Sequence, residues 1–189
     1  MRKHLDAPTE GTRAVISPLH QQDETQFMTV KREAAFHEAG HAVVAYFSKF
    51  HRVVGPINLA QYGSGEIFVA LSKGKVTAAG KQIDESLSRQ PDVAVDLAIV
   101  LCAGLVCERL AEEREADIKS NADCAMPDHE LMRQVLQSAN LSKKFDCHEL
   151  KSKQLLDQHW SLVVELADAL YSARSMDALS IEEFIDARV

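Results

Sequence analysis

The segment FHEAGHAVVAYF, residues 36 to 47, holds two histidines and a glutamate at a spacing that suits metal chemistry. His37 and His41 are four residues apart, so on an α-helix both rings lie on one face, one turn apart. Two imidazoles placed in this way can direct nitrogen atoms at a single zinc ion about 2.0–2.1 Å away. Glu38 is rotated by about 100° around the helix, so its carboxylate is expected to reach a bound water rather than the metal.

This H-E-x-x-H pattern predicts hydrolysis of an amide bond. Zinc lowers the pKa of a bound water to roughly 7, and Glu38 can then act as general base and pass the proton to the leaving amine. The alternative is a pair of surface histidines on an amphipathic helix. Alanines and Val43 surround the pair, however, which predicts burial, and two buried imidazoles without a partner are costly. The surroundings therefore favour a metal site.

A catalytic zinc site needs a third protein ligand and leaves a fourth position for water. The spacing of residues does not identify this ligand. Its candidates carry carboxylate, imidazole or thiol groups and are Glu108, Asp123, Asp128, His129, Cys147 and His148. Asp128 leads this set, but an acidic residue in the first turn of a helix also has a purely structural explanation. From the residues alone, the choice stays open.

The motif requires a helix, and the sequence predicts one from about Val30 to Phe50 with Thr29 as its cap. Two apolar alternating stretches follow, at 53–59 and 67–71, and the Tyr62–Gly65 segment between them offers a turn. We expect a small hairpin or sheet beside the metal-binding helix.

A second long helix begins at Pro91 and Asp92, two residues that suit the first turn. It continues through VAVDLAIVLCAGLVCERLAEER, which is apolar nearly all round, so we expect a central buried helix. Three further helices are expected at residues 127–139, 148–173 and 180–188. Ser180 and Glu183 form a possible capping box for the last of them.

These elements predict a mostly α domain over residues 29–189. Residues 1–28 are polar and interrupted by prolines, which indicates a flexible N-terminal arm. The length of 189 residues fits a single domain of this kind.

The composition narrows the function further. A formal net charge of −7 argues against nucleic-acid binding. The four cysteines form no C-x-x-C pair and no disulfide framework, which favours a reducing, cytoplasmic compartment. The longest nearly apolar run, residues 93–106, is too short to span a bilayer. No phosphate-binding loop motif is present, so ATP hydrolysis by this chain is not expected.

Beyond the motif, AAFHEAGHAVVAYF resembles the zinc-binding helix in the protease domain of FtsH-type membrane ATP-dependent zinc metalloproteases. Four later segments are similar to successive parts of that domain: INLAQYGSGEIFVAL, AIVLCAGLVCERLAEE, MPDHELMRQVLQSA and VVELADALYSARSMDALSIEEFIDA. The resemblance covers about residues 30–189 in order, and its most specific part is HEAGH.

The resemblance implies a mostly helical protease domain with a small sheet. It implies that His37 and His41 bind zinc and that Glu38 is the general base. It also implies an aspartate as third ligand, which aligns best with Asp128. Glu108 falls at the family's A-E-E position, where packing and hydrogen bonding near the metal helix are expected.

The chain also departs from the family pattern. Ala103-Gly104 replaces a Gly-Gly pair, and Met126-Pro127 precedes Asp128 where small residues and Asn are usual. The ATPase module and membrane segments of the family have no counterpart here, so the expectation is a freestanding, ATP-independent and soluble zinc endopeptidase.

Without its own motor, the expected substrates are peptides or unfolded segments, and a separate ATPase or a homo-oligomer could assist. The stretch Glu66–Leu71 could offer an open strand edge to an extended substrate, although a paired structural hairpin is the alternative. Two other functions remain: a non-catalytic metal-binding interaction or regulatory module, and hydrolysis of a non-peptide amide.

Overall fold

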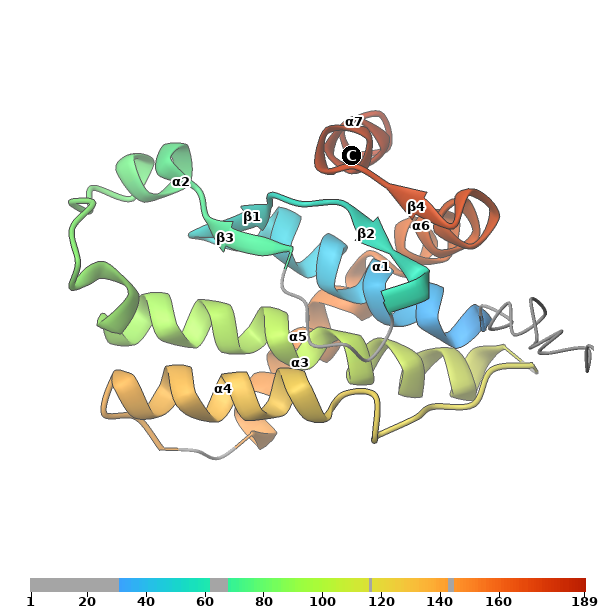
Figure 1. Ribbon diagram of the computed structural model, residues 1–189, viewed down its shortest axis with the longest axis horizontal. Helices are drawn as coiled ribbons and strands as arrows, with labels where there is room; N and C mark the ends of the chain where they lie inside the picture. Colours follow the sequence, from blue (N-terminus) through green and yellow to red (C-terminus); the bar gives the residue numbers. More distant parts are fainter. Residues whose placement is uncertain (1–30, 62–67, 116, 143–144) are drawn as a thin grey trace, which may run out of the picture.

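The computed structural model of the chain describes residues 31–61, 68–115, 117–142 and 145–189. Its helices are α1 (Arg32–Phe47), α2 (Lys73–Ala78), α3 (Pro91–Arg114), α4 (Met126–Ser138), α5 (Asp146–Gln158), α6 (Trp160–Ala173) and α7 (Ala178–Asp186). Its strands are β1 (His51–Val53), β2 (Ile57–Asn58), β3 (Val69–Leu71) and β4 (Ser175–Met176). The prediction of a mostly helical fold with a small sheet is confirmed (Figure 1).

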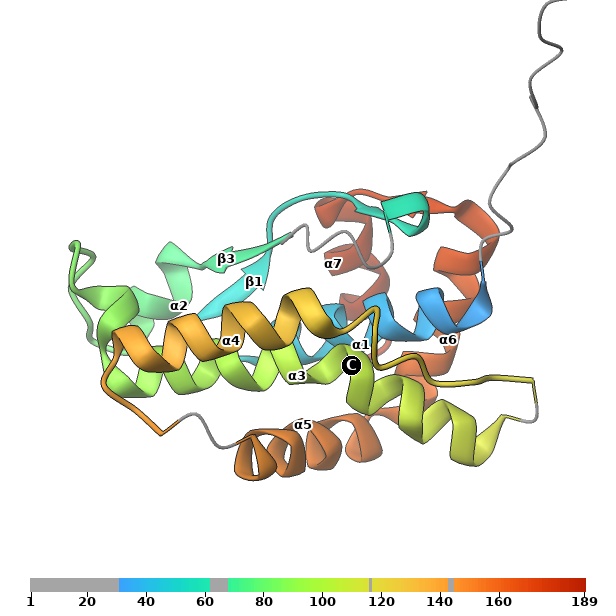
Figure 2. The same ribbon diagram turned by 60° about the horizontal axis from the view of Figure 1, so that its bottom comes forward.

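Helix α3 is the centre of the molecule, as its apolar sequence predicts. It begins with Pro91 at its first turn and packs against α1, α4 and α5. Figure 2 shows α5 and the pair β1–β3 on opposite sides of the layer that contains α3 and α4. The buried side chains of these helices, together with those of α6 and α7, form one main core. The hydrophobic driving force therefore holds α1 and α3 together at the middle of the fold.

Helices α1 and α3 cross closely because both carry small residues at the crossing. A Cβ atom added at Gly40 would lie 2.5 Å from Cys107 Cβ and 2.7 Å from the Ala103 carbonyl oxygen. No side chain fits at those distances, so only glycine allows the two backbones to approach in this way. The approach brings His37 and His41 of α1 up to Gly104 of α3.

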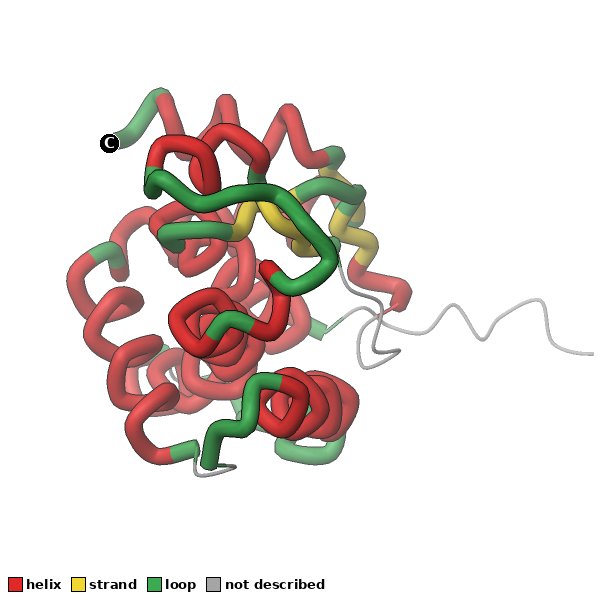
Figure 3. Tube along the Cα trace, turned by 90° about the vertical axis from the view of Figure 1, so that its left-hand side faces the viewer, coloured by secondary structure: helices red, strands yellow, loops and turns green. Residues whose placement is uncertain are grey.

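The strands form two separate two-stranded sheets. Strand β1 pairs antiparallel with β3, so the expected small sheet beside α1 is present. The prediction that 53–59 acts as one strand is wrong, because β2 leaves β1 and pairs with β4 instead. Strand β4 follows Arg174, whose left-handed conformation (φ 66) turns the chain back after α6. Figure 3 shows the strands (yellow) between the helix at the top of the view and the helices below.

The prediction of a single helix over 148–173 is also wrong. The helix is interrupted at His159 (φ −115, ψ 26), which separates α5 from α6. The break turns Trp160 onto Phe36 of α1, where the two rings stack with centroids 5.9 Å apart. This stretch contains no glycine or proline, so tertiary packing rather than local sequence causes the break.

The last helix begins earlier than predicted. Asp177 caps α7, and its Oδ1 accepts a hydrogen bond from the Ser180 backbone N–H at 2.8 Å. The Ser180–Glu183 capping box is therefore not formed at the start of the helix.

Some predictions fall outside the described residues: the N-terminal arm at 1–28, the Thr29 cap and the Tyr62–Gly65 turn. Across the described ranges, no helix has both the length and the apolar character needed to cross a lipid bilayer.

Candidate metal centre

Three side chains from two helices meet between α1, α3 and α4. His37 and His41 project from α1 and are only 2% and 5% exposed. Asp128 comes from the first turn of α4. The two Nε2 atoms are 3.1 Å apart, and Asp128 Oδ2 lies 3.1 Å from His37 Nε2 and 3.3 Å from His41 Nε2. The structure thus brings together the two motif histidines and the leading candidate for the third ligand.

These spacings fit a tetrahedral metal ion. Ligand atoms placed about 2.0–2.1 Å from a zinc ion at tetrahedral angles lie ~3.3 Å from one another. The room for this arrangement comes from α3, because a Cβ atom added at Gly104 would lie within 2.5 Å of both imidazole Nε2 atoms. Gly104 is therefore the residue of α3 that the two rings face.

Hydrogen bonds behind the rings prepare both histidines for a metal. His41 Nδ1 lies 2.8 Å from the Val100 carbonyl oxygen, which can only accept, so Nδ1 carries the proton. His37 Nδ1 lies 2.6 Å from Glu108 Oε1, with the same consequence when that carboxylate is ionised. A metal that displaces the remaining protons would then meet a lone pair of each Nε2 at the same point as Asp128. Partners of this type orient the imidazole ligands of zinc in general.

Glu108 lies behind the cluster rather than in it. Its side chain is fully buried, one oxygen faces His37 Nδ1, and Oε2 accepts a 2.6 Å hydrogen bond from the backbone N–H of Asn121. This position agrees with hydrogen bonding near the metal helix and not with direct ligation. The same carboxylate joins the His37 ring to the loop that leads to α4.

Glu38 has a carboxylate oxygen without a use in the fold. Its Oε2 is buried and has no hydrogen-bond partner in the part of the chain that the structure describes. Burial raises the pKa of this carboxyl group, and the charges of His37 and His41 act in the opposite direction. A buried carboxylate oxygen without a hydrogen-bond partner costs free energy of folding. Its presence in Glu38 indicates that this side chain interacts with a group that the fold itself does not supply.

The pKa values of His37 and Asp128 show that the cluster attracts positive charge. Burial lowers the pKa of His37, but hydrogen bonds with Asp128 and Glu108 outweigh it and raise the pKa to about 10. Burial raises the pKa of Asp128, yet the charge of His41 and the hydrogen bonds of both imidazoles bring that pKa far below its usual range. The cluster is rich in acceptors and calls for a cation or protons at its centre.

The remaining candidates lie elsewhere. Asp123 is exposed on the loop before α4, and the His129 ring packs against Phe145 with centroids 5.3 Å apart. On α5, Cys147 Sγ lies 3.3 Å from His148 Nδ1. Within the ranges that the structure describes, none of these side chains joins the three ligand atoms.

Sequence reasoning missed three contributors to the site. A backbone carbonyl such as that of Val100 leaves no signal in the residue types. Gly104 did carry a signal, since an isolated glycine inside an apolar helix often marks a close approach. Phe68, whose ring centroid lies 6.1 Å from that of His41, is one apolar residue among many near the strands.

The sequence matches no known protein-family model and no curated protein. The function of the site must therefore be inferred from its own geometry and chemistry.

Proposed function

We propose that this chain is a zinc-dependent endopeptidase that cleaves peptides or unfolded segments. The observation that carries the proposal is the buried, unpartnered Oε2 of Glu38 beside three converging ligand atoms. A site that only held a metal for stability would have no need for that carboxylate. An enzyme needs it as a proton acceptor.

The donor set supports a catalytic rather than a structural role. Two imidazoles and one carboxylate make a three-ligand site, which leaves a fourth position for solvent or substrate. Structural zinc sites favour closed, cysteine-rich coordination instead. Cys102 and Cys107 of α3 are buried in the core, and burial raises the pKa of Cys102 to about 12.

In the proposed mechanism, His37, His41 and Asp128 would hold the ion. When bound, zinc supplies an acidified water and polarises the substrate carbonyl. Glu38 accepts the proton of the nucleophile and delivers it to the leaving amine. Glu108 and the Val100 carbonyl keep the two imidazoles in the tautomer that leaves Nε2 free of a proton.

Within the described residues, one edge of β3 has no pairing strand, and this edge supports a peptide as substrate. The bonds from Val54 N–H to Phe68 O (2.7 Å) and from Ser72 N–H to Phe50 O (2.8 Å) fix the register of the β1–β3 ladder. In that register Ala70 bonds to β1, whereas the N–H and C=O groups of its two neighbours point away from β1. An extended peptide can pair with such an edge.

The edge begins next to the metal centre. Strand β3 starts directly after Phe68, whose ring packs against the edge of the His41 ring. A peptide paired with β3 would therefore pass close to the proposed zinc site. Main-chain pairing tolerates many sequences, which suits a protease for unfolded segments.

The resemblance of the chain to the FtsH-type protease domain supports the same proposal. It adds the expectation of an aspartate as third ligand, which supports Asp128 in that role. It also raises the possibility of a separate ATPase that delivers unfolded chains, or of a homo-oligomer that encloses them.

The decisive experiment replaces Glu38 with glutamine in the full chain. We expect Glu38→Gln to keep the zinc content of the wild type and to lose hydrolysis of an unfolded, fluorescently labelled casein by at least a hundredfold. Glu33→Gln, on the same helix, serves as control and should keep both properties. Zinc content is measured by elemental analysis, and folding by circular dichroism.

Two results would overturn the proposal. One is a wild-type protein that binds zinc stoichiometrically but cleaves neither casein nor a diverse peptide library, which would favour a non-catalytic metal-binding module. The other is undiminished cleavage by Glu38→Gln. Asp128→Asn tests the ligand set separately, because it should weaken zinc binding and leave the fold intact.

A further inference from the structure

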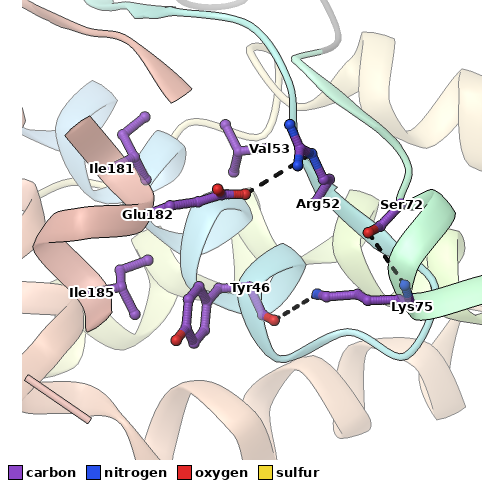
Figure 4. A pocket seen from close by; sticks show the side chains of 8 residues that line it. All are labelled: Tyr46, Arg52, Val53, Ser72, Lys75, Ile181, Glu182 and Ile185. Atoms are coloured by element: carbon purple, nitrogen blue, oxygen red, sulfur yellow. Dashed lines mark hydrogen bonds and ion pairs between the residues drawn. The ribbon is translucent and has the colours of Figure 1, made fainter. Parts of the chain in front are cut away.

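A cavity lies apart from the candidate metal centre and shares no residue with it. Its volume is about 330 Å³, and it opens between α7, β1 and the C-terminal end of α1 (Figure 4). Three aliphatic side chains form its apolar part: Val53, Ile181 and Ile185. Figure 4 shows Arg52 and Glu182 on opposite sides of the opening. A cavity with an apolar end and charged groups at its mouth suits a ligand of the same mixed character.

The outer edge of β1 borders this cavity. Arg52 pairs with Ala70 of β3, so the N–H and C=O of His51 and Val53 point to the other side of β1. His51 confirms this direction, because its carbonyl oxygen accepts hydrogen bonds from Lys75 Nζ and Ser48 Oγ. The Val53 backbone groups have no such partner among the described residues, although Val53 is only 2% exposed. Buried backbone groups are rarely left without a partner, so this edge calls for one.

The charges around the cavity favour a carboxylate. Arg52 Nε lies 3.9 Å from Glu182 Oε1, which is too long for a hydrogen bond, and its side chain is 48% exposed. The N–H groups of the Arg52 guanidinium therefore stay available for a bidentate contact with a carboxylate.

Lys75 adds a second positive charge. Its ammonium group donates to the carbonyl oxygens of Ala45, Tyr46 and His51 at 2.7–3.0 Å, which uses all three of its protons. No carboxylate in the described ranges lies within ion-pair distance of it. Two cations and a single carboxylate thus line the cavity.

We propose that this cavity binds the C-terminal residue of an extended peptide that ends in an aliphatic side chain. The terminal carboxylate pairs with Arg52, and the aliphatic side chain enters the space between Val53, Ile181 and Ile185. The preceding main chain pairs with the N–H and C=O of Val53, which lines the cavity. The site is independent of the metal chemistry proposed above, because the cavity and the candidate metal centre have no residue in common.

The test uses the full chain with the Glu38→Gln substitution, so that a peptide is not consumed during titration. The probe is acetyl-Ala-Ala-Ala-Leu with a free carboxylate, and binding is measured by calorimetry at pH 7. We expect the C-terminal amide of the same peptide to bind at least about tenfold more weakly, because a charge-assisted contact is lost. Replacing the terminal leucine with serine should weaken binding to a similar extent.

Arg52→Gln should reproduce the loss seen with the amide. Its matched control is Arg109→Gln, because Arg109 has a similar exposure of 50% and contacts Glu149 on α5, away from this cavity. The control should bind like the parent protein. The methyl signals of Ile181 and Ile185 should shift in NMR spectra when the peptide binds.

Several outcomes would overturn the proposal: equal affinity for carboxylate and amide, equal effects of Arg52→Gln and Arg109→Gln, or no binding at millimolar peptide. Free leucine that binds as tightly as the peptide would refute the main-chain contact with Val53. Because these readouts need no catalysis, they remain valid whether or not the chain is a peptidase.

Discussion

At the scale of single residues, the candidate metal centre depends on side chains that are not themselves candidate ligands. The buried carboxylate of Glu108 accepts from Asn121 N–H and holds His37 Nδ1 at 2.6 Å. It therefore decides which nitrogen of His37 carries the proton. The H-E-x-x-H motif alone does not secure this tautomer.

We expect Glu108→Gln to lower zinc affinity by about 10–100-fold, because a neutral amide orients the imidazole less strongly and lowers its basicity. Affinity is measured by competition with a chelator of known strength. Glu113→Gln, an exposed change on the same helix, is the control and should leave affinity unchanged. Equal affinities for Glu108→Gln and the wild type would contradict this role.

Gly104 offers a second prediction at this scale. An alanine methyl group there would lie within 2.5 Å of both Nε2 atoms, so Gly104→Ala should abolish zinc binding and destabilise the fold by about 1–3 kcal/mol. Gly74→Ala is the matched change, since its added methyl would meet nothing closer than Ser72 Oγ at 4.0 Å. Zinc content and urea denaturation distinguish the two variants. Normal zinc content in Gly104→Ala would show that the rings do not need this space.

At the scale of secondary-structure elements, α1, α3 and α4 each make a distinct contribution. Helix α1 places two imidazoles on one face, α3 supplies the orienting groups and the space, and the first turn of α4 supplies Asp128. Strand β3 adds an edge beside this assembly. The site is therefore a junction of elements rather than a property of one helix.

The edge of β3 can be tested with two proline substitutions. Val69 N–H points away from β1, so Val69→Pro removes a donor from the open edge and no ladder bond. We expect this variant to lose peptide hydrolysis while zinc content and thermal stability stay close to wild type. Ala70→Pro removes an N–H that bonds to β1 and should lower stability as well. Unchanged cleavage by Val69→Pro would exclude substrate pairing at this edge.

At the scale of the whole molecule, Asp96 joins α1 to α3, two of the three helices that form the site. It accepts from Lys49 N–H, Phe50 N–H and His51 Nδ1 at 2.7–3.0 Å, which ties the turn after α1 to α3. Burial raises the pKa of this carboxyl group. The hydrogen bonds from His51 and from the two backbone N–H groups lower the pKa by more than burial raises it, so the net effect is a decrease.

This decrease makes a signed prediction about stability. A carboxyl group whose pKa is lower in the folded state stabilises the fold above its unfolded pKa of about 3.9. That contribution is lost as the pH falls through the folded value. We expect Asp96→Asn to reduce the free energy of unfolding by about 1–3 kcal/mol at pH 7, and the difference from wild type to narrow below about pH 4.

Urea denaturation of metal-depleted protein at pH 7, 5 and 3 measures this difference without a contribution from zinc. Asp123→Asn on the exposed loop is the control and should stay close to wild type throughout. A difference between wild type and Asp96→Asn that does not change with pH would refute the electrostatic account of Asp96.

Much of this architecture could be predicted from the order of residues. The apolar run after Pro91 predicts α3 because a helix that is apolar all round must be buried, and α3 is central. The spacing of His37 and His41 places both rings on one helical face whatever the rest of the fold does. The pairing of β2 with β4 and the helix break at His159 could not be predicted from the local sequence. Both depend on contacts between segments that are distant in the chain.

The sequence by itself therefore determined the pair of imidazoles, the neighbouring carboxylate and the helices that carry them, since these follow from periodicity along one element. It left open which acidic residue completes the set, because Glu108 and Asp128 are 71 and 91 residues from His37 along the chain. Only the packing of α3 and α4 against α1 turned Glu108 towards Nδ1 and Asp128 towards Nε2. Glu108 and Asp128 both carry a carboxylate, and only the tertiary structure decides which nitrogen of His37 each of them contacts.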